Sequence, residues 1–266
     1  MSIKINTAIL ESFKLSRMPF LERSTTSFRY GRFTENLDLL STVFYSRQIA
    51  SITGAAGSGK SSLVFYALNE LEPTEFRVAS IELSNPNKKA LYRTLASKMG
   101  LKPFFNADDI KNQIINFFNE ENSQGKFNCV IIDEAHTLSI PMFDELRSFY
   151  DEGANFSIVL SGLPSISKLL NLSSNISLKQ RISLFLECQG LSLSETRDYI
   201  LDELSKARAG ATIFDEKCYP LFYTLTGGSI RKINQLCYSS MLEAYKDKKF
   251  IVTEDLIKTA HERMAY

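Results

Sequence analysis

A run of small residues around one lysine is where this sequence first points to chemistry. Residues 54–61 read GAAGSGKS and fit the pattern G-x-x-x-x-G-K-[ST]. The run follows the apolar segment QIASI and precedes LVFYALNEL, whose apolar residues repeat at helical spacing. It would therefore join a strand to a helix, where backbone N–H groups can close around phosphate oxygens. A glycine-rich turn that binds nothing is the alternative.

The pattern gives each of its polar residues a task. Lys60 is expected to bridge the β- and γ-phosphate oxygens of a nucleotide, and Ser61 to offer its hydroxyl to Mg²⁺. The other residues expected to hold the nucleotide are Gly54, Gly57, Gly59 and Ser62.

An acidic pair follows the apolar run FNCVII. Asp133 ends this predicted strand, where it would lie beside the phosphate loop and hold Mg²⁺ through water. Glu134 would then polarise the water that attacks the γ-phosphate. Two acidic residues that cap the next helix are the alternative. Together with the loop, the pair predicts an enzyme that hydrolyses ATP, with ATP and Mg²⁺ as its ligands.

The acidic pair is part of the sequence DEAH, which also occurs in helicases. Such helicases need two similar α/β domains, and no strand pattern for a second one follows residue 191. His136 is therefore expected to be a polar residue at the start of the next helix.

Strand and helix patterns alternate along the first part of the chain. The strand candidates are residues 48–53, 76–83, 127–133, 156–162 and 182–188. This alternation predicts an α/β fold with a parallel sheet. From Leu191 onward, four helix-like segments follow one another without a strand. The predicted domains are therefore an α/β domain over 1–190 and an all-helical domain over 191–266.

Composition excludes several classes of protein. The formal net charge is +1, which argues neither for nor against a nucleic-acid partner. The two histidines do not form an HExxH pattern and the four cysteines show no CxxC spacing, which argues against a zinc site. The N-terminus has no apolar signal region and no apolar run reaches ~18 residues. We therefore expect a cytoplasmic protein without a membrane span.

The order of motifs resembles that of AAA+ ATPases. The segments that carry the resemblance are GAAGSGKSSL, VIIDEAHTL, IVLSGLPSI, KQRISLFLECQG and TGGSIRKINQLC. Their order is similar to the branch of ExeA-type secretion ATPases and MuB- and TnsC-type transposition ATPases. The resemblance implies a P-loop AAA+ domain with a parallel sheet flanked by helices, followed by a small all-α lid domain.

The resemblance implies roles for three further residues. Ser161, at a strand tip, would contact the γ-phosphate or the attacking water; an ordinary strand-end serine is the alternative. Arg181 would be the arginine finger that reaches the γ-phosphate of a neighbouring subunit, although the nearby Lys179 and a solvated surface charge stay open. Arg231 would fold back from the lid as the second sensor. Ile230 stands where proline commonly precedes that arginine.

Three functions fit this resemblance, all of them in a homo-oligomeric ring or filament. The first is a transposition helper that assembles on double-stranded DNA with ATP and recruits or stimulates a transposase. The second is a cytoplasmic factor that assists assembly of a secretion or pilus machine. The third is a nucleotide-gated switch that binds only a protein. The first is favoured because ExeA-type ATPases continue past the lid into a membrane span, and none is seen here.

A basic cluster offers one place for DNA contact. Lys88, Lys89 and Arg93 would lie near one face of a helix, in a region that faces the central pore of related assemblies. Repeated once per subunit, such a cluster would bind phosphates without regard to base sequence. A solvated helix face is the alternative.

Overall fold

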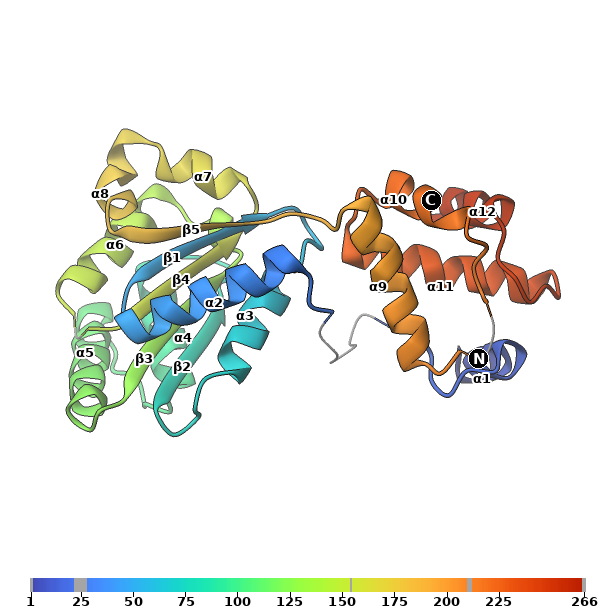
Figure 1. Cartoon of the computed structure of the whole chain (residues 1–266). Coiled ribbons are helices and arrows are strands. Elements are labelled where there is room, and N and C mark those ends of the chain that lie inside the picture. Colours follow the sequence, from blue (N-terminus) through green and yellow to red (C-terminus); the bar gives the residue numbers. More distant parts are fainter. Residues whose placement is uncertain (1, 22–27, 154, 210–211, 265–266) are drawn as a thin grey trace. The chain divides into compact units, whose positions relative to one another are not determined.

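The chain folds into two compact units, and each is described by itself. The computed structural model describes residues 2–21, 28–153, 155–209 and 212–264. Unit 1 comprises Met1–Tyr30, Ala56–Ser58 and Gln189–Tyr266, and unit 2 comprises Gly31–Ala55 and Gly59–Cys188. Unit 2 contains the sheet, whereas the secondary structure of unit 1 consists of helices and one isolated β-bridge in the part of the chain described (Figure 1).

The sheet of unit 2 has five strands in the order β2-β3-β4-β1-β5, and all of its pairs are parallel. The strands are β1 (Ile49–Gly54), β2 (Phe76–Glu82), β3 (Phe127–Asp133), β4 (Ser157–Gly162) and β5 (Ile182–Cys188). Because parallel strands point the same way, the carboxyl ends of β1, β3 and β4 meet at one edge of the sheet. The predicted α/β fold and its strands are confirmed.

Helices cover both faces of this sheet (Figure 1). They are α2 (Gly31–Ser46), α3 (Lys60–Asn69), α4 (Lys88–Lys98), α5 (Ala107–Ser123), α6 (Ile140–Asp151), α7 (Ser165–Leu170) and α8 (Ile176–Lys179). One core contains alternate residues of β3 and β4 together with buried side chains of α4, α5 and α6. Strand β4 is buried along its whole length, as is usual for an interior strand of a parallel sheet with helices on both faces.

A partly buried carboxylate, that of Glu145, joins three of the helices. The hydroxyl of Tyr92, on α4, is fully buried and donates to Oε1 of Glu145, on α6, at 2.5 Å. Burial, followed by this hydrogen bond, raises the pKa of Tyr92. Nζ of Lys88 lies 3.2 Å from the same carboxylate, and Nζ of the buried Lys111, on α5, lies 3.7 Å from it. Glu145 thus supplies an acceptor to the buried Tyr92 and Lys111, and also pairs with the more exposed Lys88.

Unit 1 is built from helices at both ends of the described chain. They are α1 (Ser2–Phe13), α9 (Leu193–Lys206), α10 (Cys218–Thr226), α11 (Ile230–Lys246) and α12 (Glu254–Met264). A capping box formed by Ser192 and Glu195 starts α9. The four predicted C-terminal helices are therefore present.

The N-terminal helix packs with unit 1 and not with the sheet. Ile9 and Phe13 are buried in the same core as Leu236 of α11, and the hydroxyl of Tyr238 donates to Oδ1 of Asn6 at 2.9 Å. This grouping differs from the predicted boundary, which assigned all of 1–190 to the α/β domain. Apolar periodicity indicates that a helix has a buried face but not which element covers it.

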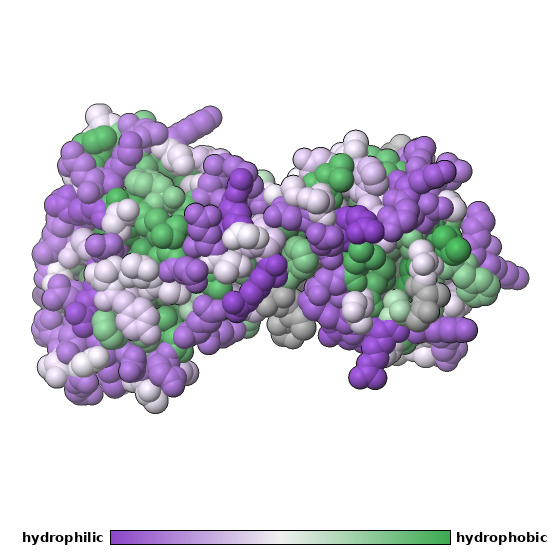
Figure 2. Space-filling view, viewed as in Figure 1, coloured by the Kyte–Doolittle hydropathy of each residue, from purple (hydrophilic) through white to green (hydrophobic). Residues whose placement is uncertain are grey.

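The described helices include none that is both long and apolar enough to cross a bilayer. On the face seen in Figure 2, the surface of each unit is mostly hydrophilic, with apolar side chains in small patches. This distribution is ordinary for a domain whose surface meets water.

Substitution of Glu145 tests the role of the buried network. Glu145→Ala leaves the hydroxyl of Tyr92 without its acceptor and Lys111 with one carboxylate fewer, so we expect the free energy of unfolding to fall by about 2–4 kcal/mol. Asp144→Ala is the matched control, because its exposed carboxylate pairs only with Arg147 in the described network, and it should cost under about 0.5 kcal/mol. Urea denaturation measures both, and equal losses would contradict the assignment.

Candidate nucleotide site

The phosphate loop runs from the end of β1 to the start of α3. Gly57 has a φ of 77° and Gly59 a φ of 92°, a region that residues with a side chain rarely adopt. These two glycines bend the backbone so that the loop ends at the first turn of α3, where N–H groups have no partner within the helix. The predicted strand–loop–helix context is therefore present.

Lys60 lies almost buried at the start of α3, with 7% of its surface exposed. Its Nζ donates to the carbonyl oxygens of Gly54 at 2.8 Å and Ala55 at 3.0 Å. No carboxylate among the described residues forms an ion pair with it, and Oγ of the buried Ser58 has no hydrogen-bond partner there. A buried cation without an anion is costly. The loop therefore fits a phosphate group, which would supply the missing charge and acceptors.

The carboxylate of Asp133 connects three segments at the carboxyl edge of the sheet. Oδ1 accepts from Oγ of Ser161 and from the backbone N–H of Glu134, both at 2.9 Å. Oδ2 accepts from Oγ of Ser61 at 3.4 Å. The pairing of Ile132 with Leu160 explains this meeting, because it sets Asp133 beside Ser161. The four predicted residues are thus brought together.

The same arrangement fits Mg²⁺. Two donors hold Oδ1 of Asp133, so Oδ2 is directed toward the hydroxyl of Ser61. Carboxylate and hydroxyl oxygens are the hard donors that Mg²⁺ takes, together with water and phosphate oxygens. Among the described residues, this edge of the sheet included, no cluster of three or more His, Cys, Asp or Glu residues is placed to hold a metal by itself.

Glu134 follows Asp133 in an uncommon backbone conformation. Its φ of 52° lies in the left-handed region, which costs free energy for a residue other than glycine. The carboxylate is 45% exposed, and its Oε2 lies 3.4 Å from Nδ1 of His136. An acidic side chain that is free to meet water next to Asp133 suits the role predicted for it, activation of water.

Arg181 is held by an acidic residue that the sequence did not reveal. Its Nε donates to Oδ1 of Asp151 at 2.5 Å and its Nη2 to Oδ2 at 2.7 Å, a bidentate pair. The hydrogen bond from Arg181, together with the guanidinium charge, lowers the pKa of Asp151. Asp151 of the same chain therefore fixes the orientation of the Arg181 guanidinium, the predicted arginine finger.

The position of Arg181 also decides which phosphates it can reach. It immediately precedes β5, whose first residue pairs with Ile49 and whose last pairs with Gly54. Arg181 therefore lies at the amino edge of the sheet, whereas the phosphate loop begins at the carboxyl edge. Seven strand residues separate these edges by about 20 Å, more than an arginine side chain can span. The phosphates of its own loop are therefore out of its reach, and contact with the nucleotide of a neighbouring subunit stays a prediction.

Two further predicted residues lie at helix starts. Ser62 is exposed in the first turn of α3, beside Ser61. Arg231 is exposed in the first turn of α11, in unit 1. Contact of Arg231 with the nucleotide stays a prediction.

The basic cluster divides into two parts on α4. Lys88 pairs with Asp108 at 2.7 Å, and this hydrogen bond raises the pKa of Lys88. Nζ of Lys89 lies 4.2 Å from the centre of the Phe105 ring, and Arg93 is exposed. Residues 89 and 93 share a face at helical spacing, whereas residue 88 shares the face of the buried residue 92. Lys89 and Arg93 thus share one face of α4, whereas Lys88, whose side chain is 40% exposed, is paired with carboxylates.

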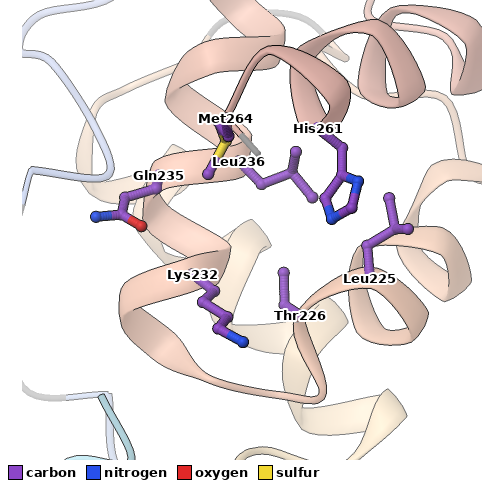
Figure 3. A pocket seen from close by; sticks show the side chains of 7 residues that line it. All are labelled: Leu225, Thr226, Lys232, Gln235, Leu236, His261 and Met264. Atoms are coloured by element: carbon purple, nitrogen blue, oxygen red, sulfur yellow. The ribbon is translucent and has the colours of Figure 1, made fainter. Parts of the chain in front are cut away.

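A separate pocket of about 220 Å³ lies in unit 1. Its lining comes from α10, α11 and α12 and consists of Leu225, Thr226, Lys232, Gln235, Leu236, His261 and Met264 (Figure 3). None of the predicted site residues is in this lining.

The fold and the loop together define the class of protein. Residues 43–170 match the family model described as an AAA domain. This part of the chain is an AAA-type P-loop ATPase domain. The predicted class is therefore confirmed, whereas membership of a branch with MuB and TnsC stays a prediction.

One curated relative extends the comparison beyond the domain. The chain is 27% identical over 224 residues to General secretion pathway protein A of Aeromonas hydrophila. The match covers 79% of this chain and 40% of that protein, so the chain spans less than half the length of this relative.

Solved structures share the fold at low sequence identity. Cdc6p of Pyrobaculum aerophilum superposes with a TM-score of 0.75 at 13% identity, and covers 92% of this chain and 70% of its own. ORC2 of Aeropyrum pernix gives a TM-score of 0.68 at 15% identity, with 92% and 70% covered. At these identities the likeness supports the fold alone.

Two substitutions separate nucleotide binding from hydrolysis. Lys60→Ala removes the buried charge that faces the phosphates, so ATP binding should be lost. Glu134→Gln keeps the loop and removes only the group that activates water, so it should bind ATP like wild type and hydrolyse it about 10²–10⁴-fold more slowly. Titration with a fluorescent ATP analogue and a phosphate-release assay measure the two effects. A wild-type hydrolysis rate for Glu134→Gln would rule out its assignment as base.

Loss of Arg181 tests whether the site is shared between subunits. Arg181→Ala should lower hydrolysis by about 10³-fold without weakening ATP binding, because the finger lies too far from its own loop. Arg147→Ala is the matched control: Arg147 pairs with the same Asp151 but carries no predicted catalytic role.

Mixing inactive subunits gives the complementary result. Arg181→Ala and Lys60→Ala subunits should together recover part of the hydrolysis, because some composite sites then pair an intact loop with an intact arginine. No recovery in a mixture that demonstrably co-assembles would refute a shared site.

Proposed function

We propose that this protein is an ATP-hydrolysing homo-oligomer that assists assembly of a multi-subunit protein machine of the secretion or pilus type. The proposal of ATP hydrolysis rests on the hydrogen bonds of Asp133. Its carboxylate accepts from the hydroxyls of Ser61 and Ser161 and from the backbone N–H of Glu134, and we call this group of contacts the Asp133 junction. The assembly part rests on the secretion-pathway relative.

Each residue of the junction has one task in hydrolysis. Lys60 and the loop amides bind the β- and γ-phosphates, and Ser61 and Asp133 hold Mg²⁺, which offsets negative charge on the phosphates when bound. Glu134 accepts the proton of the attacking water. Ser161, fixed by Asp133, orients that water or a γ-phosphate oxygen.

Oligomerisation follows from the place of Arg181. A cation at the amino edge of the sheet completes the site of a neighbour, so hydrolysis depends on contact between subunits. A ring or a filament of identical subunits repeats this contact, and ATP binding then changes the shape of the whole assembly.

The surface around α4 favours a protein partner over DNA. The carboxylates of Asp108 and Glu145 offset the charge of Lys88. Asp109 adds a further negative charge in the first turn of α5. The adjoining loop between α4 and α5 exposes Phe104 by 57% and Phe105 by 79%. Exposed aromatic rings with few net charges suit a protein interface better than a phosphate backbone.

A DNA-bound assembly that acts with a transposase is the second candidate. The observation in its favour is that Lys89 and Arg93 share the exposed face of α4. Both candidates take ATP as substrate and therefore act in the cytoplasm.

Duplex DNA binding in the presence of a non-hydrolysable ATP analogue separates the two candidates. Under the assembly proposal, fluorescence anisotropy should detect no analogue-dependent binding, even at low salt, and genes beside this one should encode secretion or pilus proteins. Binding that requires the analogue, ignores sequence and weakens with salt by about −0.9 log units per phosphate would favour the DNA candidate. The triple variant Lys88→Ala, Lys89→Ala, Arg93→Ala would then abolish it.

A further inference from the structure

His136 lies between the predicted catalytic glutamate and the end of β4. It belongs to the 3₁₀ turn η1 (Ala135–Thr137), and its side chain is 17% exposed. Nδ1 accepts from the backbone N–H of Leu163 at 3.3 Å and lies 3.4 Å from Oε2 of Glu134. One nitrogen atom therefore touches both the carboxylate expected to activate water and the segment that follows Ser161.

The missing side chain at Gly162 makes this approach possible. A Cβ built there would lie 3.0 Å from the backbone nitrogen of His136 and 3.2 Å from Nδ1. Both distances are shorter than ordinary van der Waals contact. A glycine before Leu163 thus lets the imidazole sit directly against the end of β4.

The two contacts of Nδ1 exclude each other as hydrogen bonds. Nδ1 can accept from the N–H of Leu163 only when it carries no proton, and it can donate to Glu134 only when it carries one. In the first state the carboxylate of Glu134 faces the lone pair of Nδ1, which offers it no hydrogen bond, and it is therefore free to turn toward water. In the second state, reached when Nδ1 takes a proton from solvent, the carboxylate is held by Nδ1–H, and the N–H of Leu163 loses its acceptor.

The backbone of Glu134 is held independently of His136. Oγ1 of Thr137 donates to the carbonyl oxygen of Glu134 at 2.9 Å, and the N–H of Glu134 donates to Asp133. Changes at His136 therefore act on the Glu134 side chain and on the end of β4, while the turn itself stays supported.

We propose that His136 is a positioning residue whose Nδ1 hydrogen-bonds either to the N–H of Leu163 or to the carboxylate of Glu134. The orientation of that carboxylate then depends on the position of the end of β4. Ser161 lies two residues before Leu163 and donates to Asp133. A displacement of this strand end, which the predicted sensor would undergo on meeting a γ-phosphate, is then transmitted to Glu134. The inference rests on the ATPase activity proposed above.

Two variants of His136 test the inference. His136→Phe keeps the ring and removes the nitrogen, so kcat for ATP hydrolysis should fall about tenfold while KM for ATP and the affinity for a fluorescent ATP analogue stay at wild-type values. His136→Asn offers Oδ1 or Nδ2 near the place of Nδ1 and should recover most of kcat. His261→Phe is the matched control, because it makes the same substitution on α12, outside the predicted nucleotide site, and it should leave kcat at the wild-type value.

The outcomes separate this inference from the proposed function. A wild-type protein that hydrolyses no ATP as an assembled oligomer would refute the function itself. A wild-type protein that hydrolyses ATP, with His136→Phe at an equal or higher kcat, would overturn only the inference. A loss of ATP affinity in parallel with kcat, or an asparagine variant as slow as the phenylalanine variant, would also overturn it. Urea denaturation midpoints within the range of wild type establish that both variants fold.

Discussion

The nucleotide site depends on the hydrogen bonds that the carboxylate of Asp133 accepts. This carboxylate accepts hydrogen bonds from a hydroxyl of α3, a hydroxyl of β4 and the backbone N–H of the next residue. These donors meet only because β1, β3 and β4 are parallel neighbours that end at one edge. One oxygen is fixed by two donors, which leaves the other directed at Ser61. The sheet order thus becomes a preorganised arrangement for phosphate and a hard cation.

The two edges of the same sheet divide the work of hydrolysis. The carboxyl edge holds the phosphate loop, Asp133 and Glu134, whereas Arg181 precedes β5 at the amino edge and is oriented there by Asp151. Because a strand length separates them, one subunit cannot place all the charges around one nucleotide. If Arg181 acts as the predicted arginine finger, this separation would make hydrolysis depend on contact between subunits, as the proposed function requires.

Sequence reasoning succeeded where local rules decide the outcome. Strand periodicity, the glycines of the loop and the position of Asp133 at a strand end predicted the sheet and the closeness of Asp133 to the phosphate loop, whereas Ser161 was singled out only by the resemblance to AAA+ ATPases. It could not find partners that only the tertiary fold brings together. Lys88 meets a carboxylate on α6, α1 packs with helices from the other end of the chain, and His136 contacts Leu163 because β3 and β4 are neighbours. No spacing in the sequence encodes these contacts.

The Mg²⁺ dependence of ATP binding in Asp133→Asn tests the central role of Asp133 most directly. Asparagine keeps the shape and can still accept from Ser161, but it lacks the negative charge that faces Ser61. Thermal unfolding would be recorded with ATP, once with Mg²⁺ and once with a chelator. We expect wild type to gain more stability with Mg²⁺ than with chelator, and the variant to gain equally in both. A variant that keeps the full Mg²⁺-dependent gain would contradict this account.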